Sequence, residues 1–490
     1  MQISAIVQRF RAAVSQYPDR PAIIGTEASF SYSELERRAA SVALHVAERV
    51  PGPIVALLHS NSPDFAPLFL GCRWAGKTVA VLPTLAPPPL LKLMAMETGV
   101  ELVICSKEFA PAMAAVGMPS WIGDTSIESG LASVERGQLP PQAISSAPAA
   151  AVLYTSGTTG RPKAVALSEE NFLANIDGFK QVTGFNHTRV IIAALPLFHS
   201  YGLMGSVLLP VTEGAAVVVP ERFIPHQILE LIEKHKVSML LAVPGQYRVL
   251  IKDPTPVDAG SLWLCIAGAE RLPESVAQEF HARFGHTLVQ GYGTTELSPV
   301  VSFSPPEINI PGSVGRPLPN IEVTIRGDLD EVLDPGEIGE VCVSGPSVML
   351  GYLNDLQATA EKVRNGVLHT ADKGYLDADG FLFLVGRADD LVKVSGEKVY
   401  PSEVENALET IDGVEEAAVI AFPDEKHGAR LHAFVHLRPG SDLKETALRT
   451  YCREMLEPQK IPRTISFVEQ MPRTLTGKTD KRTLAGSLSS

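Results

Sequence analysis

The first 300 residues alternate between two hydrophobic patterns. Stretches with apolar residues at helical spacing, such as 31–50, are separated by short continuous apolar runs typical of buried strands. Ser31 and Glu34 have the spacing of a capping box at the start of one such helix. The apolar runs are at 53–59, 78–83, 101–106, 149–155, 189–195, 215–220, 238–243, 262–268 and 286–293. This alternation predicts parallel βαβ units.

The pattern changes after about Ser302, where glycines and prolines interrupt short alternating runs. A second break falls at 386–390, and the remaining 100 or so residues have the order strand, helix, strand, turn, strand. Ser402 and Glu405 form a second candidate capping box there. The sequence therefore predicts an α/β protein with αβα-layered parallel sheets in an N-terminal domain (1–386). A β-rich subdomain (302–386) and a small α+β C-terminal domain (387–490) complete it.

Composition narrows the possible functions. The chain has 490 residues and a net charge of −13, which argues against binding a nucleic acid polymer. Its five cysteines are far apart and show no metal or disulfide spacing, and residues 1–16 lack the apolar core of a signal peptide. Residues 190–212 carry no charge, but proline, glycine and histidine interrupt them, so we expect buried core and no transmembrane segment. We expect a cytoplasmic protein.

The segment TSGTTGRPK (155–163) joins two apolar runs and has the composition of an anion-binding loop. Gly157 and Gly160 allow backbone N–H groups to turn inward around a phosphate. Hydroxyl groups and Lys163 add further donors. The spacing differs from that of the common P-loop. Taken alone, the segment fits a polar surface loop as well as a phosphate site.

The same segment resembles the phosphate loop of the adenylate-forming superfamily, which includes acyl-CoA synthetases, peptide-synthetase adenylation domains and beetle luciferases. Other motifs of that superfamily follow in the expected order and extend the resemblance over nearly the whole chain. They lie at 196–203, 291–296, 369–380, 386–405 and 472–482. Within the superfamily, the stretches 267–273 and 291–320 are similar to the acyl–acyl carrier protein synthetase branch, whereas CoA is the common acceptor among free-standing members.

The resemblance implies ATP and Mg²⁺ as cofactors. Tyr292 would offer a flat face to the purine, and Thr295 a hydroxyl to the α-phosphate. Glu296 would bind the metal, since Mg²⁺ prefers carboxylate oxygens. Glu270 fits an exposed charge at a helix start equally well, and Arg387 fits a salt bridge at the domain boundary. The implied nucleotide-binding residues are Thr155, Ser156, Gly157, Thr158, Thr159, Gly160, Lys163, Gly268, Ala269, Glu270, Gly291, Tyr292, Gly293, Thr294, Thr295, Asp372 and Arg387.

The resemblance also implies two half-reactions. In the first, an acid displaces pyrophosphate from ATP, and Lys478 of a mobile C-terminal domain stabilises the charge that develops where the two anions meet. In the second, a thiol attacks the acyl-adenylate. Rotation about a hinge at Asp389 would withdraw Lys478 and present Lys393 and Gly396 at the thiol channel. The implied catalytic residues are Lys478, Thr295, Glu296 and Lys393.

The resemblance implies an acyl site at His199, Gly202, Val243 and Leu297, although a histidine in such an apolar segment also fits a buried core residue. No acidic residue lies between 198 and 203 to hold an α-ammonium group, and apolar residues predominate, so a medium- or long-chain fatty acid is expected. CoA is the expected acceptor, with an acyl carrier protein as the alternative. Six Lys or Arg residues in 458–482 suggest a basic edge that suits both. A pathway-specific carrier-protein ligase and a catalytically silent homologue are the rival hypotheses, and a fatty substrate is compatible with peripheral membrane contact.

Overall fold

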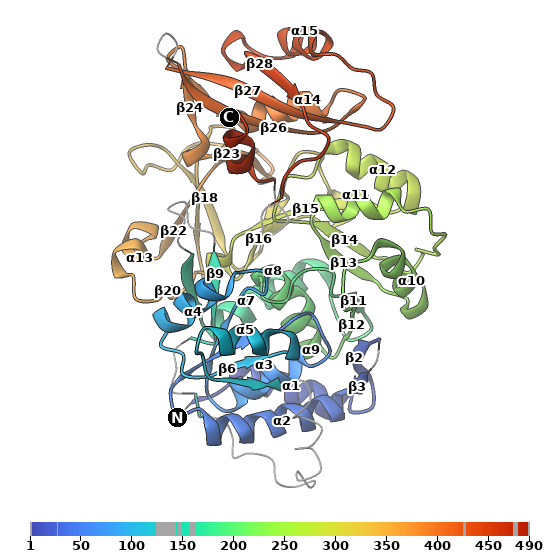
Figure 1. The fold of residues 1–490 in the computed structure, drawn as a ribbon, viewed down its shortest axis with the longest axis vertical. Helices are drawn as coiled ribbons and strands as arrows, with labels where there is room; N and C mark the ends of the chain where they lie inside the picture. The colour runs from blue at the N-terminus through green and yellow to red at the C-terminus, as the bar shows by residue number, and fades with distance from the viewer. Residues whose placement is uncertain are drawn as a thin grey trace.

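The computed structural model describes residues 2–26, 28–123, 144–145, 149–155, 162–424, 428–473 and 479–488 (Figure 1). Two large sheets with helices packed on them form the lower and middle part of the molecule in Figure 1, and the C-terminal part lies above them. The helices are α1 (Ala5–Gln16), α2 (Tyr32–Arg49), α3 (Phe65–Trp74), α4 (Pro88–Glu97), α5 (Ala110–Ala115), α7 (Glu169–Thr183), α8 (Ser200–Leu203), α9 (Leu209–Glu213), α10 (Pro225–His235), α11 (Pro244–Lys252), α12 (Glu274–Phe284), α13 (Leu356–Lys362), α14 (Pro401–Glu409), α15 (Glu445–Met455) and α16 (Lys481–Gly486).

The first sheet has seven strands. Its order is β20 (Gly351–Tyr352), β10 (Lys163–Leu167), β9 (Ala151–Thr155), β5 (Thr78–Val81), β4 (Ile54–Leu58), β6 (Val103–Cys105) and β7 (Ser120–Ile122). The strands from β9 to β7 are parallel, whereas β10 and β20 are antiparallel to their neighbours. The predicted βαβ units are therefore present.

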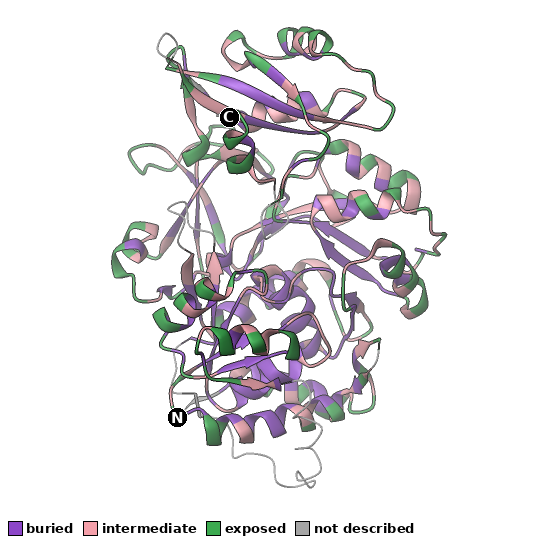
Figure 2. Cartoon of the chain, in the orientation of Figure 1, coloured by how far each residue is buried: buried purple, intermediate pink, exposed green. Residues whose placement is uncertain are grey.

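The second sheet has nine strands. Its order is β17 (Arg316–Pro317), β16 (Val300–Phe303), β15 (Leu288–Gly293), β14 (Leu264–Ala267), β13 (Met239–Ala242), β11 (Val190–Ile192), β12 (Ala216–Val219), β2 (Pro21–Gly25) and β3 (Ser29–Ser31). Its central strands are parallel and buried. One hydrophobic cluster contains Val55 and Val79 of the first sheet together with Ile191 and Val217 of the second, so the main core lies between the two sheets (Figure 2).

The remaining strands form smaller sheets. One has β18 (Glu322–Arg326), β19 (Gly339–Ser344), β22 (Val367–Leu376), β21 (Val363–Arg364) and β23 (Leu382–Arg387). A three-stranded sheet is formed by β26 (Val414–Asp424), β27 (Gly428–Leu437) and β28 (Thr464–Phe467). Two strand pairs remain: β24 (Val392–Val394) with β25 (Glu397–Val399), and β1 (Gln2–Ile3) with β8 (Ile144–Ser145). The sheet that contains β18 begins at Glu322, later than the expected position near Ser302, because β16 and β17 continue the nine-stranded sheet.

The two predicted helix caps had different outcomes. Ser31 and Glu34 form the expected capping box of α2. The box at Ser402 and Glu405 was wrong, because α14 begins at Pro401 and proline is favoured at a first helical position. The Ser402 hydroxyl instead donates to Val385 O at 2.7 Å and joins α14 to β23.

Residues 203–212 are buried in the core as expected, and no helix in the described ranges is both long and apolar enough to cross a bilayer. The C-terminal part contacts the large domain through polar side chains. Arg248 and Lys252 of α11 pair with Glu416 and Glu415 of β26. Arg438 pairs with Glu279 of α12 at 2.8 Å.

Candidate active site

The two ends of the candidate phosphate loop lie side by side. Thr155 ends β9 and Lys163 begins β10, and the two residues are direct partners in the antiparallel pair. Residues Ser156, Gly157, Thr158, Thr159 and Gly160, and also Lys478, lie outside the described residues.

Tyr352 links Lys163 to the candidate metal ligand. The Lys163 ammonium lies over the Tyr352 ring, 4.7 Å from its centre. The Tyr352 hydroxyl donates to Glu296 Oε1 at 2.9 Å. Burial, together with the charge of Glu296, raises the pKa of Tyr352, so the phenol remains a donor at neutral pH. Sequence reasoning missed Tyr352, which stands in an ordinary apolar stretch.

Tyr292, Asp372 and Arg387 form a second group. Asp372 is 8% exposed. The Tyr292 hydroxyl donates to its Oδ2 at 2.5 Å, and the Arg387 guanidinium donates to its Oδ1 at 2.9 Å. Asp372 and Arg387 are also register partners in β22 and β23. The predicted purine and ribose contacts are thus brought together from three strands, and Arg387 pairs with a member of the site.

The turn before Asp372 has a strained backbone. Ala371 has φ of 64°, a conformation that costs a residue with a Cβ about 1–2 kcal/mol. Glu340 holds it, since its Oε1 accepts from Ala371 N at 2.9 Å while Oε2 lies 3.2 Å from His369 Nδ1. Cys342 Sγ is 3.4 Å from the same nitrogen. These three side chains are spaced like metal ligands. In the metal-free protein burial raises the pKa of Cys342 to about 12, so the thiol is protonated within this group.

Lys362, at the end of α13, lies among the carboxylates of the site and was also missed. Its ammonium donates to Thr370 O at 2.8 Å. Burial lowers its pKa, and the nearby charges of Glu296 and Asp372 oppose that shift. A lysine in the last turn of a helix is normally solvated, so no local pattern distinguished Lys362.

The loop after β15 contributes two hydroxyl groups. Thr295 Oγ1 lies 3.1 Å from Ser200 Oγ, which joins the loop after β15 to the start of α8. Thr294 Oγ1 is buried and has no hydrogen-bond partner within the described structure. An unpaired buried hydroxyl is costly, and a bound phosphate could satisfy it.

The candidate glycines are required by packing. A Cβ on Gly293 would lie 2.1 Å from Pro299 O, and one on Gly268 would lie 2.7 Å from the Tyr201 ring. Gly291 is less constrained, with 3.2 Å to Ile266. The neighbouring Ala269 is exposed with φ of 67°, and Glu270 is half-buried.

The acyl candidates surround α8 and α11. His199 caps α8, and its Nδ1 accepts from Tyr201 N at 3.3 Å. A Cβ on Gly202 would lie 2.2 Å from Pro196 O, so close helix packing explains this glycine without a substrate. Leu297 is fully buried and Val243 partly buried.

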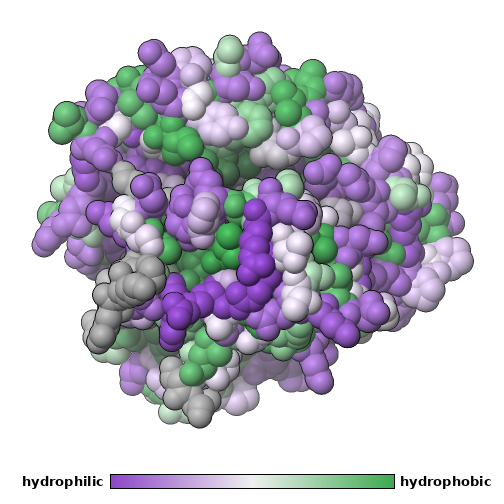
Figure 3. All heavy atoms as spheres, turned by 90° about the horizontal axis from the view of Figure 1, so that it is seen from above, coloured by the Kyte–Doolittle hydropathy of each residue, from purple (hydrophilic) through white to green (hydrophobic). Residues whose placement is uncertain are grey.

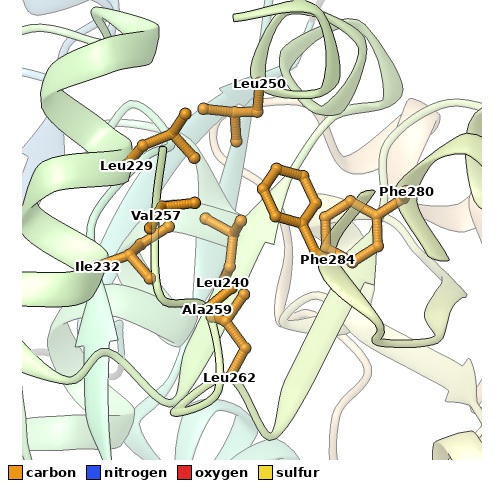
Figure 4. A pocket seen from close by; sticks show the side chains of 9 residues that line it. All are labelled: Leu229, Ile232, Leu240, Leu250, Val257, Ala259, Leu262, Phe280 and Phe284. Atoms are coloured by element: carbon orange, nitrogen blue, oxygen red, sulfur yellow. The ribbon is translucent and has the colours of Figure 1, made fainter. Parts of the chain in front are cut away.

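An apolar cavity between α10, α11 and α12 holds only about 10 Å³ (Figure 4). That volume is at the lower limit for one water molecule, so we interpret it as a packing gap in the core.

The candidate hinge and thiol residues lie together after β23. Asp389 is in a short turn of 3₁₀ helix (Ala388–Asp390), Lys393 is exposed on β24, and Gly396, with φ of 89°, lies in the turn between β24 and β25.

The predicted basic edge is largely neutralised. Lys460 pairs with Glu403, Arg473 with Glu416 and Lys481 with Glu405. Arg463 and Arg482 are exposed. Hydrophilic and hydrophobic residues are interspersed over the C-terminal face seen in Figure 3. Carboxylates from other elements thus offset part of the charge of this edge, which a local count of charges does not reveal; its role as a basic docking edge stays a prediction.

Comparison with known proteins identifies related chains. Residues 10–353 match the AMP-binding enzyme family, and residues 403–478 match the AMP-binding enzyme C-terminal domain. A long-chain-fatty-acid–CoA ligase of Salmonella typhimurium is 30% identical, with 98% of this chain and 94% of that protein covered. A feruloyl-CoA synthase of an Amycolatopsis species is 33% identical, with 92% of each covered.

Two further similarities concern the acceptor and the fold. The fatty acid–[acyl-carrier-protein] ligase ScoC of Streptomyces coeruleorubidus is 29% identical, with 99% of this chain and 96% of that protein covered. The crystal structure of ATP-bound MatB from Rhodopseudomonas palustris superposes with a TM-score of 0.92 at 28% identity, covering 100% of this chain and 99% of that one.

Proposed function

The chain belongs to the AMP-binding enzyme family of adenylate-forming enzymes, and we propose that it joins a medium- or long-chain fatty acid to a thiol through an acyl-adenylate. As a member it is an AMP-forming acid–thiol ligase that binds ATP. The observation that carries the proposal is the clamp on Asp372, a nearly buried carboxylate fixed by Tyr292 and Arg387.

In the first half-reaction, Asp372 accepts hydrogen bonds from the ribose hydroxyls, and Lys163 and Thr294 donate to phosphate oxygens. Glu296 suits Mg²⁺, because Tyr352 engages only Oε1 in the contacts seen here and a carboxylate oxygen is the ligand that this ion prefers. A bound Mg²⁺ would neutralise phosphate charge. Lys478 approaches the acid and the α-phosphate, stabilises the developing charge and leaves with its domain.

The second half-reaction uses the C-terminal domain differently. We place the domain boundary at 386/387 and the hinge at Asp389. Rotation there brings Lys393 and Gly396 to the entrance through which the thiol arrives. The acidic chain and its largely neutralised edge do not distinguish CoA from a carrier protein. We propose CoA as the acceptor, with the likeness to ScoC favouring a carrier protein as the second candidate.

The fatty substrate follows from the apolar acyl segment. Leu203, Met204 and Leu297 are buried, and residues 198–203 contain no carboxylate that could pair with an amino acid's ammonium group. Each buried methylene contributes about 0.8 kcal/mol, which rewards an aliphatic tail. The likeness to a feruloyl-CoA synthase makes an aromatic acid the competitor to be tested.

A pyrophosphate-release screen tests the proposal. Straight-chain acids from acetate to stearate and ferulate are supplied with ATP, and CoA or holo-carrier protein is offered as acceptor. We expect release with medium or long chains and a matching thioester. Release only with ferulate, or no thioester with either thiol, would reject the fatty ligase. Lys478→Ala should abolish adenylate formation and leave thiolysis of supplied acyl-adenylate intact.

A further inference from the structure

Glu416 of β26 is a nearly buried carboxylate, 8% exposed, that receives hydrogen bonds from three side chains. The Arg473 guanidinium donates two hydrogen bonds to it, at 3.0 Å to Oε1 and 2.6 Å to Oε2. The Thr479 hydroxyl donates to Oε1 at 2.5 Å, and Arg248 donates to Oε2 at 3.4 Å. Charge-assisted, bidentate bonds of this kind fix geometry more firmly than single neutral ones.

Two of these donors flank one short segment of the chain. Arg473 and Thr479 enclose residues 474–478, and they face each other as an isolated antiparallel bridge. Asp480 N also donates to Pro472 O at 2.8 Å, which closes the base. Lys478 directly precedes Thr479 in the sequence. Because consecutive Cα atoms are about 3.8 Å apart, Glu416 fixes a residue, Thr479, that is one position from Lys478 along the chain.

The third donor comes from the other domain. Arg248 lies on α11 of the large domain, so one carboxylate connects that helix with both ends of the segment. The preceding residue provides a contrast. Glu415 also bridges to α11, through Lys252 at 2.5 Å, but makes no contact with Arg473 or Thr479 among the bonds seen in the described structure.

We infer that Glu416 is a positioning residue for the adenylate-forming half-reaction. It connects Arg473 and Thr479, which flank residues 474–478, with Arg248 of the large domain. The inference rests on the proposed function and extends it. Because the thiol-transfer step proceeds after Lys478 has withdrawn, Glu416 should be dispensable for it.

The test compares Glu416→Gln with Glu415→Gln in the full chain. Acid-dependent ATP–pyrophosphate exchange reports the first half-reaction, and thiolysis of supplied acyl-adenylate reports the second. We expect Glu416→Gln to lower the exchange kcat about 10- to 100-fold with little change in the KM for ATP, because an error of about 1 Å in position costs that much. Thiolysis should stay within about threefold, which also shows that the variant is folded.

The remaining variants distinguish a positioning role of Glu416 from a general loss of folding or activity. Glu415→Gln should leave both half-reactions within about twofold, since its pair is partly exposed. Arg473→Gln should reproduce the selective loss, and the double variant should be no worse than either single one, as expected for residues that act as a unit. Equal loss of both half-reactions in Glu416→Gln, or an equal effect of Glu415→Gln, would overturn the inference. Absence of exchange by the wild-type enzyme with every acid would instead overturn the proposed function, and this inference with it.

Discussion

Glu409 of α14 gives the domain interface a pH dependence that can be measured. Its side chain lines a groove of about 490 Å³ between α12 and α14, and Oε1 accepts from Ala417 N at 3.2 Å. Burial raises the pKa of Glu409 to about 7, while the charges of Arg248 and Arg271 oppose that shift. The folded protein therefore holds a proton on Glu409 at pH values where the unfolded chain has lost it.

The size and sign of the effect follow from linkage. The difference between about 7 and the ordinary 4.5 corresponds to about 3 kcal/mol. Because the folded-state pKa is raised, the stabilising contribution is fully present below about pH 4.5 and is lost as the pH rises through about 7. Above that value the folded protein carries a poorly solvated carboxylate at the interface.

Glu409→Gln removes the titration and keeps the shape of the protonated acid, including an acceptor for Ala417. Its free energy of unfolding should equal that of the wild type near pH 4 and exceed it by about 3 kcal/mol near pH 8. Denaturant unfolding followed by far-ultraviolet circular dichroism measures this in the transition of the C-terminal domain. Glu454→Gln, an exposed residue of α15, is the control. A difference between wild type and Glu409→Gln that is the same at both pH values would refute the reasoning.

Three other substitutions probe the site and its scaffold. Asp372→Asn removes a charged acceptor worth about 1.5–3 kcal/mol, so the KM for ATP in pyrophosphate exchange should rise about 10- to 100-fold, and an unchanged KM would exclude a ribose contact. Tyr352→Phe removes the hydrogen bond to Glu296 and should raise the Mg²⁺ concentration for half-maximal exchange about tenfold, while the KM for the acid stays constant. Equal shifts in both quantities would argue against metal binding by Glu296. Gly202→Ala places a Cβ 2.2 Å from Pro196 O and should cost about 1–3 kcal/mol in thermal unfolding, and unaltered stability would contradict the packing role.

The sequence predicted the large-domain fold because its strands are buried on both faces. Continuous apolar runs such as 238–243 and 262–268, separated by helical patterns, are typical of parallel strands that helices cover on both faces. Motif order then located Asp372, Arg387 and Tyr292, which the structure joins directly. The local pattern was sufficient to select residues that lie together, and their contact with a nucleotide stays a prediction.

Tyr352 and Lys362 were missed for a different reason. Each reaches the site from β20 or α13, and neither differs locally from a core tyrosine or a solvated lysine. Their roles arise from tertiary contacts with Glu296 and Thr370. The same limitation applies to the basic edge, where the carboxylates that pair with Arg473 and Lys481 lie far away in the sequence.

The type of contact between the domains determines how much free energy the proposed rotation costs. The ion pairs that join α11 or α12 to the C-terminal domain include two that are partly exposed, Lys252 with Glu415 and Arg438 with Glu279. Partly exposed pairs contribute about 0–1 kcal/mol each, because water replaces the partner when they separate. A hydrophobic interface would lose about 25 cal/mol for every Å² exposed. An interface built from exchangeable charges can open and close within a catalytic cycle, and this favours a hinge at Asp389 over a fixed arrangement.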